Sequence, residues 1–245
     1  MTRKYFYNRK KAFHTEGIYK MSRKIEVVDY RPEWEKEYKE EAKKIRQALG
    51  KNCVSIEHIG STAVKGMKAK PIIDIMPVVK KLSGVDELHE ELEALGYVCK
   101  GENGIVGRRF FVKGGENPTF HVHIFEERNK NEIGRHLAVR EYLRNHPEDA
   151  KEYSELKSRL AAEYPEDIDG YRGGKADYVN GLEKKAVQWT EKQMKIGSYG
   201  SMGMCMGMCL GVAIGTATSN LAVCMSLGLA IGLVVGTFVG RAKAK

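Results

Sequence analysis

The chain has 245 residues, of which 42% are hydrophobic and 30% charged, and its formal net charge is +9 at pH 7. The apolar fraction is too high for a fully disordered chain, and the mean hydropathy of −0.44 excludes a protein embedded in a membrane throughout. The surplus charge lies in residues 1–24 and 196–245, whereas residues 25–195 sum to −1. A nearly neutral body disfavours a nucleic-acid partner.

The N-terminal residues 1–24 form a basic extension with eight basic side chains and one acid. This segment lacks the apolar core of a secretory signal. Met21 is an alternative start of translation, in which case the basic leader is not part of the functional protein. The five cysteines, an odd number without a CxxC pair, favour a reducing compartment over a disulfide framework.

Strand and helix patterns alternate in the first half of the body, and helices fill the second half. Strands are predicted at 25–30, 53–59, 71–79, 109–113 and 119–125. Helices are predicted at 32–50, 85–95, 132–145, 147–163 and 175–195, with a turn-rich segment at 164–174. This order predicts an α/β or α+β domain with a mixed sheet and helical cover, which we place at 25–192.

The first candidate site is the turn that follows the second predicted strand. Gly60, Ser61 and Thr62 end a strand that carries Glu57. Backbone N–H groups and a hydroxyl at a strand-to-helix turn suit a phosphate group. An ordinary turn with Ser61 as a helix N-cap explains the same residues, so both interpretations stay open.

Two more candidate sites lie on the neighbouring strands. Asp74 is the single carboxylate of the apolar segment 71–79, where a charge is costly unless it is paired or bound to a cation. His121 and His123 share one face of the strand 119–125, because side chains alternate along a strand. Two imidazoles on one face suit a metal, a carboxylate or a phosphate, and they also occur for packing alone.

The helical half of the body carries a basic face. His136, Arg140 and Arg144 recur every four residues, which places them on one side of a helix. Lys157 and Lys175 follow in the later helices. This pattern indicates either a solvated surface or a phosphate clamp above the sheet.

Residues 193–245 form a third unit, which has a different composition. No charged residue occurs from Gly197 to Gly240, over 44 positions, and two apolar runs at 198–216 and 221–239 are separated by a polar turn at 218–220. Each run approaches the roughly 20 residues that span a bilayer. Glycines recur every fourth residue in both runs, at positions 203, 207, 211, 215, 228, 232, 236 and 240.

Such glycine seams let helices pack closely in lipid, whereas in water each glycine costs about 1 kcal/mol of helix stability relative to alanine. We therefore predict a transmembrane hairpin through residues 198–240. A buried hairpin in a soluble oligomer, or a glycine-zipper assembly outside lipid, is the alternative. The seams are also a candidate surface for a homo-oligomer.

Basic residues flank the hairpin on both sides, at Lys192 and Lys195 before it and at Arg241, Lys243 and Lys245 after it. By the positive-inside rule both ends of the hairpin face the cytoplasm. This predicts a multi-pass protein of the cell membrane with both termini and the body domain in the cytoplasm.

Four segments in this order resemble the GrpB family of small bacterial proteins, which belongs to the nucleotidyltransferase superfamily. They are EHIGSTAV at 57–64, AKPIIDI at 69–75, HVH at 121–123 and REYLRNHP at 140–147. The resemblance spans about residues 25–189. It implies a nucleotidyltransferase-like fold and a location in the bacterial cell membrane for the hairpin.

The resemblance also implies a ligand and a chemistry. In the superfamily a Gly-Ser turn, matched by Gly60 and Ser61, holds a nucleoside triphosphate, and an acid on the next strand, matched by Asp74, holds Mg²⁺ or Mn²⁺. The metal assists attack on the α-phosphate with release of pyrophosphate. The groups expected to contact or neutralise the phosphates are Thr62, Lys70, Arg140, Lys157 and Lys175.

The chain departs from the superfamily pattern at two places. A second acid is expected two residues after the first, where this chain has Met76, and a third acid on the neighbouring strand is replaced by His121 and His123. These histidines join Asp74 in the predicted metal site, and Glu57 is a candidate replacement for the missing carboxylate.

Two functions are compatible with these residues. The first is a membrane-tethered, metal-dependent enzyme of the nucleotidyltransferase type with an unknown acceptor, in which Asp74 and Glu57 are catalytic. The second is a noncatalytic module that binds a nucleotide or a phosphorylated small molecule and uses the hairpin for membrane attachment or assembly.

Overall fold

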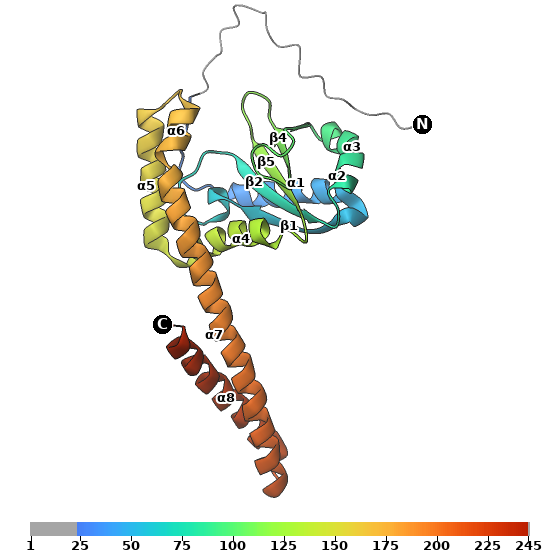
Figure 1. Ribbon diagram of the computed structural model, residues 1–245, viewed down its shortest axis with the longest axis vertical. Helices are drawn as coiled ribbons and strands as arrows, with labels where there is room; N and C mark the ends of the chain where they lie inside the picture. Colours follow the sequence, from blue (N-terminus) through green and yellow to red (C-terminus); the bar gives the residue numbers. More distant parts are fainter. Residues whose placement is uncertain (1–23, 245) are drawn as a thin grey trace, which may run out of the picture.

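A computed structural model describes residues 24–244, which form an α/β body and a long helical hairpin (Figure 1). Five strands make one sheet in the order β1-β2-β5-β4-β3. The β2–β5 pair is parallel and the other pairs are antiparallel, so the sheet is mixed. The strands are β1 (Cys53–Ile59), β2 (Ile73–Val79), β3 (Tyr97–Cys99), β4 (Arg108–Lys113) and β5 (Phe120–Glu126). The predicted fold class, a mixed sheet with helical cover, is confirmed.

One face of the sheet is covered by α1 (Glu33–Leu49), α2 (Ser83–Glu87) and α3 (His89–Ala94). Trp34, Ile45 and Leu49 lie on one side of α1 because their spacing follows the helical repeat. They join the buried side chains of β2, including Ile73 and Ile75, in the largest apolar cluster of the body. The short helical turn η1 (Gly50–Asn52) then connects α1 to β1.

The second face is covered by α4 (Lys130–Asn145), which packs on Ile59, Met76 and Phe125. The remaining helices of the body are α5 (Pro147–Glu163), α6 (Ile168–Gly174) and the first part of α7 (Ala176–Ala217). Figure 1 shows these three helices standing together beside the sheet. Apolar contacts of α5 and α7 with α4 and with Val64 and Met67, which follow the η2 turn (Ser61–Ala63), hold the end of β1 in place.

Several predicted elements differ from the structure. The segment 25–30 is not a strand: it makes one isolated bridge, between Val28 and Ala69, because Ile25 packs against Leu160 and Tyr171 instead. The predicted helix 85–95 is divided into α2 and α3 at Leu88, which leaves the helical conformation with ψ 26°. The short strand β3 was not predicted, and α6 lies in the segment predicted to consist of turns.

The hairpin begins inside a helix of the body. α7 is continuous over 42 residues, so the predicted domain boundary at 192 falls within one helix. α8 (Leu221–Lys243) returns antiparallel to α7 after the predicted turn, in which Ser219 has φ 55°. Figure 1 shows α7 leaving the body and α8 folding back along it.

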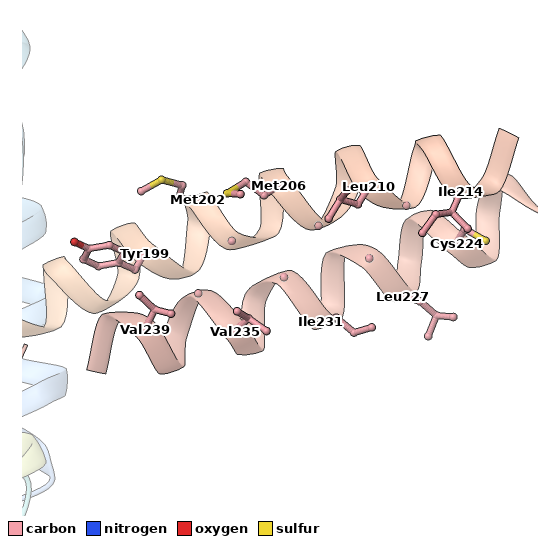
Figure 2. Close-up of a pocket in the computed structure, with 16 residues that line it drawn as sticks. Tyr199, Met202, Met206, Leu210, Ile214, Cys224, Leu227, Ile231, Val235 and Val239 are labelled. Carbon is pink, nitrogen blue, oxygen red and sulfur yellow. The ribbon is translucent and has the colours of Figure 1, made fainter. Parts of the chain in front are cut away.

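The glycine seams of α7 and α8 face each other. A Cβ atom at Gly203 would overlap the carbonyl group of Gly232, and one at Gly207 would overlap that of Gly228. Beside this seam lies an apolar groove of about 640 Å³, lined by Met206 and Leu210 on α7 and by Ile231 and Val235 on α8 (Figure 2). The glycines therefore serve the close approach of the two helices within one chain.

The outer surface of the hairpin is apolar and exposed. Val234 and Phe238 are 68% and 74% exposed, and both α7 and α8 contain a stretch long and apolar enough to cross a membrane. A contiguous apolar surface of this kind is unfavourable in water and favourable in a lipid or protein environment.

Candidate functional site

A cavity of about 650 Å³ opens where β1 ends and where β2 and β5 begin. Its charged lining combines six cationic side chains with one carboxylate. The cations are Lys70, Lys100, Arg108, Lys157, Arg172 and Lys175, and the carboxylate is Asp74. An excess of positive charge at one cavity of a nearly neutral body favours an anionic ligand.

The Gly-Ser turn forms one wall of this cavity. Gly60 has φ 72°, a conformation that favours glycine. Register pairs Ile59 with Asp74 across β1 and β2, and this pairing brings the Asp74 carboxylate against Gly60. A Cβ atom at Gly60 would lie 2.5 Å from Asp74 Oδ2. Gly60 therefore satisfies two requirements, the backbone turn and the close approach of the carboxylate, and it places Ser61 and Thr62 at the cavity.

Asp74 faces both histidines, as the strand periodicity predicts. Asp74 and His121 are paired in the parallel register of β2 and β5. Asp74 Oδ1 lies 3.3 Å from His121 Nδ1 and 3.4 Å from His123 Nε2. Burial alone would raise the pKa of Asp74, but the two imidazoles outweigh it and hold that pKa far below its usual range. The carboxylate is therefore ionised, and it balances part of the positive charge.

The donor atoms of Asp74, His121 and His123 could hold a metal ion, because all three lie within 4.8 Å of one another. A donor set with two nitrogens suits Mn²⁺, Zn²⁺ or Fe²⁺ better than Mg²⁺, which prefers oxygen. Arg108 restricts this use of His123. Its Nη1 atom lies 3.2 Å from His123 Nδ1, and since a guanidinium only donates, Nδ1 accepts and the neutral ring carries its proton on Nε2. A metal at Nε2 needs the opposite tautomer, so the set fits a metal only when Arg108 releases His123.

Lys157 forms the opposite wall. This α5 side chain is 3% exposed, and its Nζ atom donates to Ser61 Oγ at 2.8 Å and to the carbonyl oxygen of Lys68. Burial, reinforced by the charges of Lys175 and Lys70 and opposed by Asp74, lowers the pKa of Lys157 to about 7. An amine in this environment gains from any anion that enters the cavity.

Tyr171 lies between two other lysines of the cavity. The Nζ atoms of Lys70 and Lys175 lie 5.3 Å and 4.9 Å from the centre of its ring. Burial lowers the pKa of Lys175 as well, and the charge of Arg172 adds to this effect, against the attraction of Asp74. Tyr171 and Arg172 of α6 and Lys175, which lies between α6 and α7, all line the cavity.

Two buried polar atoms of this cavity lack a well-formed hydrogen bond. Among residues 24–244, the buried side-chain atoms without a hydrogen-bond partner are Tyr171 Oη and His123 Nε2, the latter being 3.4 Å from Asp74 Oδ1, at the outer limit for such a bond. Both residues line the cavity. Buried polar groups are nearly always paired in folded proteins, so these two atoms point to a ligand that supplies acceptor atoms.

Most of the predicted site residues meet at this cavity, but Glu57 and Arg140 do not line it. Arg140 Nη1 donates to Glu57 Oε2 at 3.0 Å and to the carbonyl oxygen of His58 at 2.9 Å. Arg144 likewise donates to the carbonyl oxygen of Ala63. The basic face of α4 therefore holds the end of β1 and the η2 turn against the helix. It does not form the predicted phosphate clamp over the cavity.

Met76 occupies the position expected for a second acid. It is fully buried and packs with Ile59 and Phe125 under α4. A carboxylate there would be buried in an apolar cluster. Among residues 24–244, Asp74 is the single carboxylate that lines the cavity.

Some lining residues were not predicted from the sequence, among them Arg108, Phe110, Tyr171 and Arg172. The segment Tyr171-Arg172-Gly173-Gly174-Lys175 combines a tyrosine, two cations and two glycines, which are residue types common around phosphates. That composition is the signal that marks it. Arg108 shows no comparable signal, because its role depends on how β4 pairs with β5.

Comparisons with known proteins give two matches along the chain. Residues 24–185 match the family described as GrpB protein, and residues 193–242 match the family described as glycine zipper membrane protein. The second match and the two apolar helices together indicate membrane association.

Individual relatives resemble the body. UPF0157 protein YqkA of Bacillus subtilis is 44% identical over 167 residues, which cover 68% of this chain and 48% of that protein, so the chain spans about half the length of this relative. A UPF0157 protein of Pseudomonas aeruginosa is 41% identical over 70% of this chain and 71% of its own. The crystal structure of conserved protein GrpB from Enterococcus faecalis is 43% identical and superposes with a TM-score of 0.66, over 67% of this chain and 99% of that one.

Proposed function

The chain belongs to the GrpB family, and on this premise we propose that it is a membrane-associated protein that binds a nucleotide or a similar phosphorylated compound in the cavity beside Ser61. The observation that carries the proposal is the composition of the lining, in which six lysine and arginine side chains face one carboxylate among residues 24–244. Without a ligand the charged members of this set repel one another. A phosphate chain brings several negative charges and many acceptor oxygens into the same space.

The lining assigns separate roles to its parts. Ser61, Lys157 and Lys175 lie together at one side of the cavity and are suited to the phosphates. Tyr171 Oη and His123 Nε2 would gain acceptors from the ligand, and leaving such groups unpaired costs about 1–3 kcal/mol each. Phe110, Val112 and Pro118 also line the cavity and offer an apolar surface for a base or another organic group.

The test is calorimetric titration of the full-length protein in detergent micelles with ATP. Lys175→Gln removes one cation from the lining, and we expect ATP affinity to fall roughly tenfold or more, since hydrogen bonds to charged groups contribute about 1.5–3 kcal/mol. Lys184→Gln is the matched control, because Lys184 lies on α7, the helix that Lys175 precedes, and is exposed. Equal affinities for these two variants would contradict the proposed site.

A second candidate function is metal-dependent nucleotidyl transfer, which the convergence of Asp74, His121 and His123 favours. A metal bound there would neutralise phosphate charge and polarise the phosphorus for attack by an acceptor. Because Met76 is buried and Glu57 is paired with Arg140, Asp74 would be the only carboxylate ligand, which favours a single metal ion and Mn²⁺ over Mg²⁺.

Pyrophosphate release from ATP with Mn²⁺ and a panel of acceptors tests this second function. Asp74→Asn keeps the size of the side chain and removes its charge, so we expect release to fall at least a hundredfold. Release that persists in Asp74→Asn, or that needs no divalent ion, would exclude the metal-dependent reaction and leave the binding function.

The hairpin supports a proposal on topology. Lys243 Nζ lies 5.6 Å from the ring of Tyr199, so the basic residues at the start of the hairpin and those at its end lie at the same end. By the positive-inside rule that end and the body face the cytoplasm. Trypsin should then cleave the body in inside-out membrane vesicles and not in intact spheroplasts, and the reverse pattern would contradict this orientation.

The homo-oligomer through the glycine seams stays a prediction. Because the two seams pack against each other within one chain, a second copy would contact the outer faces of α7 and α8.

A further inference from the structure

Lys157 occupies an unusual place for a lysine. It is 3% exposed, and its Nζ atom is hydrogen-bonded to two neutral oxygen atoms, Ser61 Oγ and the carbonyl oxygen of Lys68. Within residues 24–244 no carboxylate lies within ion-pair distance of it. Lysine side chains are almost never buried in this way unless they are paired.

Four charged or titratable side chains surround Lys157. Lys70 precedes β2, Lys175 precedes α7, Asp74 lies on β2 and Tyr153 lies on α5 with its ring centre 4.6 Å from Lys157 Nζ. The two lysines disfavour a charge on Lys157 and Asp74 favours one. Burial adds to the effect of the lysines, so the balance lowers the pKa of Lys157 to about 7.

A neutral Lys157 can keep both of these contacts. One N–H group donates to the carbonyl oxygen of Lys68. The Ser61 hydroxyl, which accepts from the charged amine, can rotate and donate to the lone pair of the neutral one. The charged form has three donors and no lone pair, so it gains only when an additional acceptor or a negative charge arrives.

We propose that Lys157 is largely uncharged in the ligand-free protein and takes up a proton when a phosphate monoester enters the cavity, so that the cavity selects monoesters over diesters. The inference rests on the proposed phosphate site. The incoming anion supplies the counter-charge that the protein lacks, and the proton comes from the solvent. Affinity and protonation of Lys157 then reinforce each other.

Selectivity follows from the charge of the ligand. A phosphate monoester has a second pKa of about 6 and is therefore mostly a dianion at pH 7.5, whereas a diester carries one negative charge. One negative charge of the dianion balances the charge of protonated Lys157, and the second remains to interact with Lys70 and Lys175. AMP and cyclic AMP share the same base and differ in this respect, which makes them a matched pair of probes. We expect AMP to bind at least tenfold more tightly.

Calorimetric titration of the full-length protein in detergent micelles with AMP and with inorganic phosphate tests the inference. The titrations are run at pH 7.5 in HEPES and in Tris, whose ionisation enthalpies differ. Because a group with a pKa of about 7 is mostly neutral at this pH, we expect the buffer dependence to show uptake of roughly 0.5–0.8 proton per ligand. Between pH 7.5 and pH 8.5 the affinity should fall roughly sixfold to tenfold.

Two variants identify the group that takes up the proton. Lys157→Met is of similar size and cannot be protonated, so its binding heat should be the same in both buffers. Lys184→Met alters an exposed lysine outside the cavity and should keep the proton uptake. Uptake that is retained in Lys157→Met would overturn the assignment.

Titrations of the wild-type protein also test the inference without any variant. Binding of AMP with the same heat in HEPES and Tris would overturn the inference and leave the phosphate site standing, as would equal affinity for AMP and cyclic AMP. No binding of AMP or inorganic phosphate at millimolar concentration would overturn both the phosphate site and the inference. These outcomes remain available even where Lys157→Met fails to fold.

Discussion

The body and the hairpin distribute charge in opposite ways. The body is almost neutral in total and concentrates six lysine and arginine side chains around one cavity, whereas the hairpin has no charged residue over 44 positions. Both regions also use glycine for close approach, to a carboxylate at Gly60 and to a helix backbone at Gly207. A net charge and a mean hydropathy for the whole chain therefore describe neither region. The proposed ligand site depends on where the cationic residues gather, and membrane association depends on where charged residues are absent.

The largest effect is expected from a substitution that separates α7 from α8 and so lowers the stability of the hairpin. In Gly207→Val the new side chain meets the backbone of Gly228, and overpacking of this kind costs about 1–3 kcal/mol. Gly197→Val is the control, because a Cβ atom at Gly197 has no atom within 4 Å in the described structure. Thermal unfolding of the helices in detergent, followed by circular dichroism, should show a lower midpoint for Gly207→Val alone. Equal midpoints would mean that the seam does not hold α8 on α7.

The next prediction separates two reasons for a glycine at position 60, its positive φ and the close approach of Asp74. Gly60→Ala and Gly66→Ala both place a side chain at a positive φ, 72° and 81°, and each should cost about 1–3 kcal/mol of stability. Only Gly60→Ala also collides with Asp74, since no atom of residues 24–244 lies within 4 Å of a Cβ atom at Gly66.

The readout is nucleotide binding measured under conditions where both variants are folded. We expect Gly60→Ala to lose most of its affinity for ATP and Gly66→Ala to retain it. Equal loss in both would indicate that backbone strain, and not the position of Asp74, limits binding.

A more gradual effect, spread over a range of pH, concerns the acid stability of the body. Burial lowers the pKa of His58 and of His136 from 6.5 to about 4 each. The unfolded chain therefore binds more protons than the folded one between pH 6.5 and 4, so the free energy of unfolding falls as the pH decreases through this range. The shift corresponds to at most about 3 kcal/mol per histidine.

Urea unfolding at pH 7.5, 5.5 and 4.5 measures this slope. His136→Phe removes one titrating group beside Phe125 and should make the slope less steep. A stability that is constant from pH 7.5 to 4.5 would show that these histidines do not titrate with unfolding.

The elements with strong periodicity could be predicted from the sequence. Segments 53–59 and 147–163 have the same bounds as β1 and α5, and the shared face of His121 and His123 follows from strand alternation. These features depend on neighbouring residues along the chain. β3 is only three residues long and lies at the edge of the sheet, so it shows no period to detect.

The parts of the cavity that depend on tertiary packing could not be predicted. Arg140 has the sequence position of a phosphate ligand, but the docking of α4 on β1 directs it to Glu57. Tyr171 reaches the cavity because α6 packs beside α5, and Arg108 reaches His123 because β4 pairs with β5. Sequence spacing contains no information on any of these three contacts.

The central claim is that the cavity binds phosphate through its own cations. Calorimetric titration of the full-length protein with pyrophosphate in the presence of EDTA tests it most directly, because this ligand has no base and no metal is available. We predict binding that weakens steeply with salt and at least tenfold in Lys175→Gln. An absence of binding at millimolar pyrophosphate, or binding that appears only when Mn²⁺ is restored, would contradict the claim.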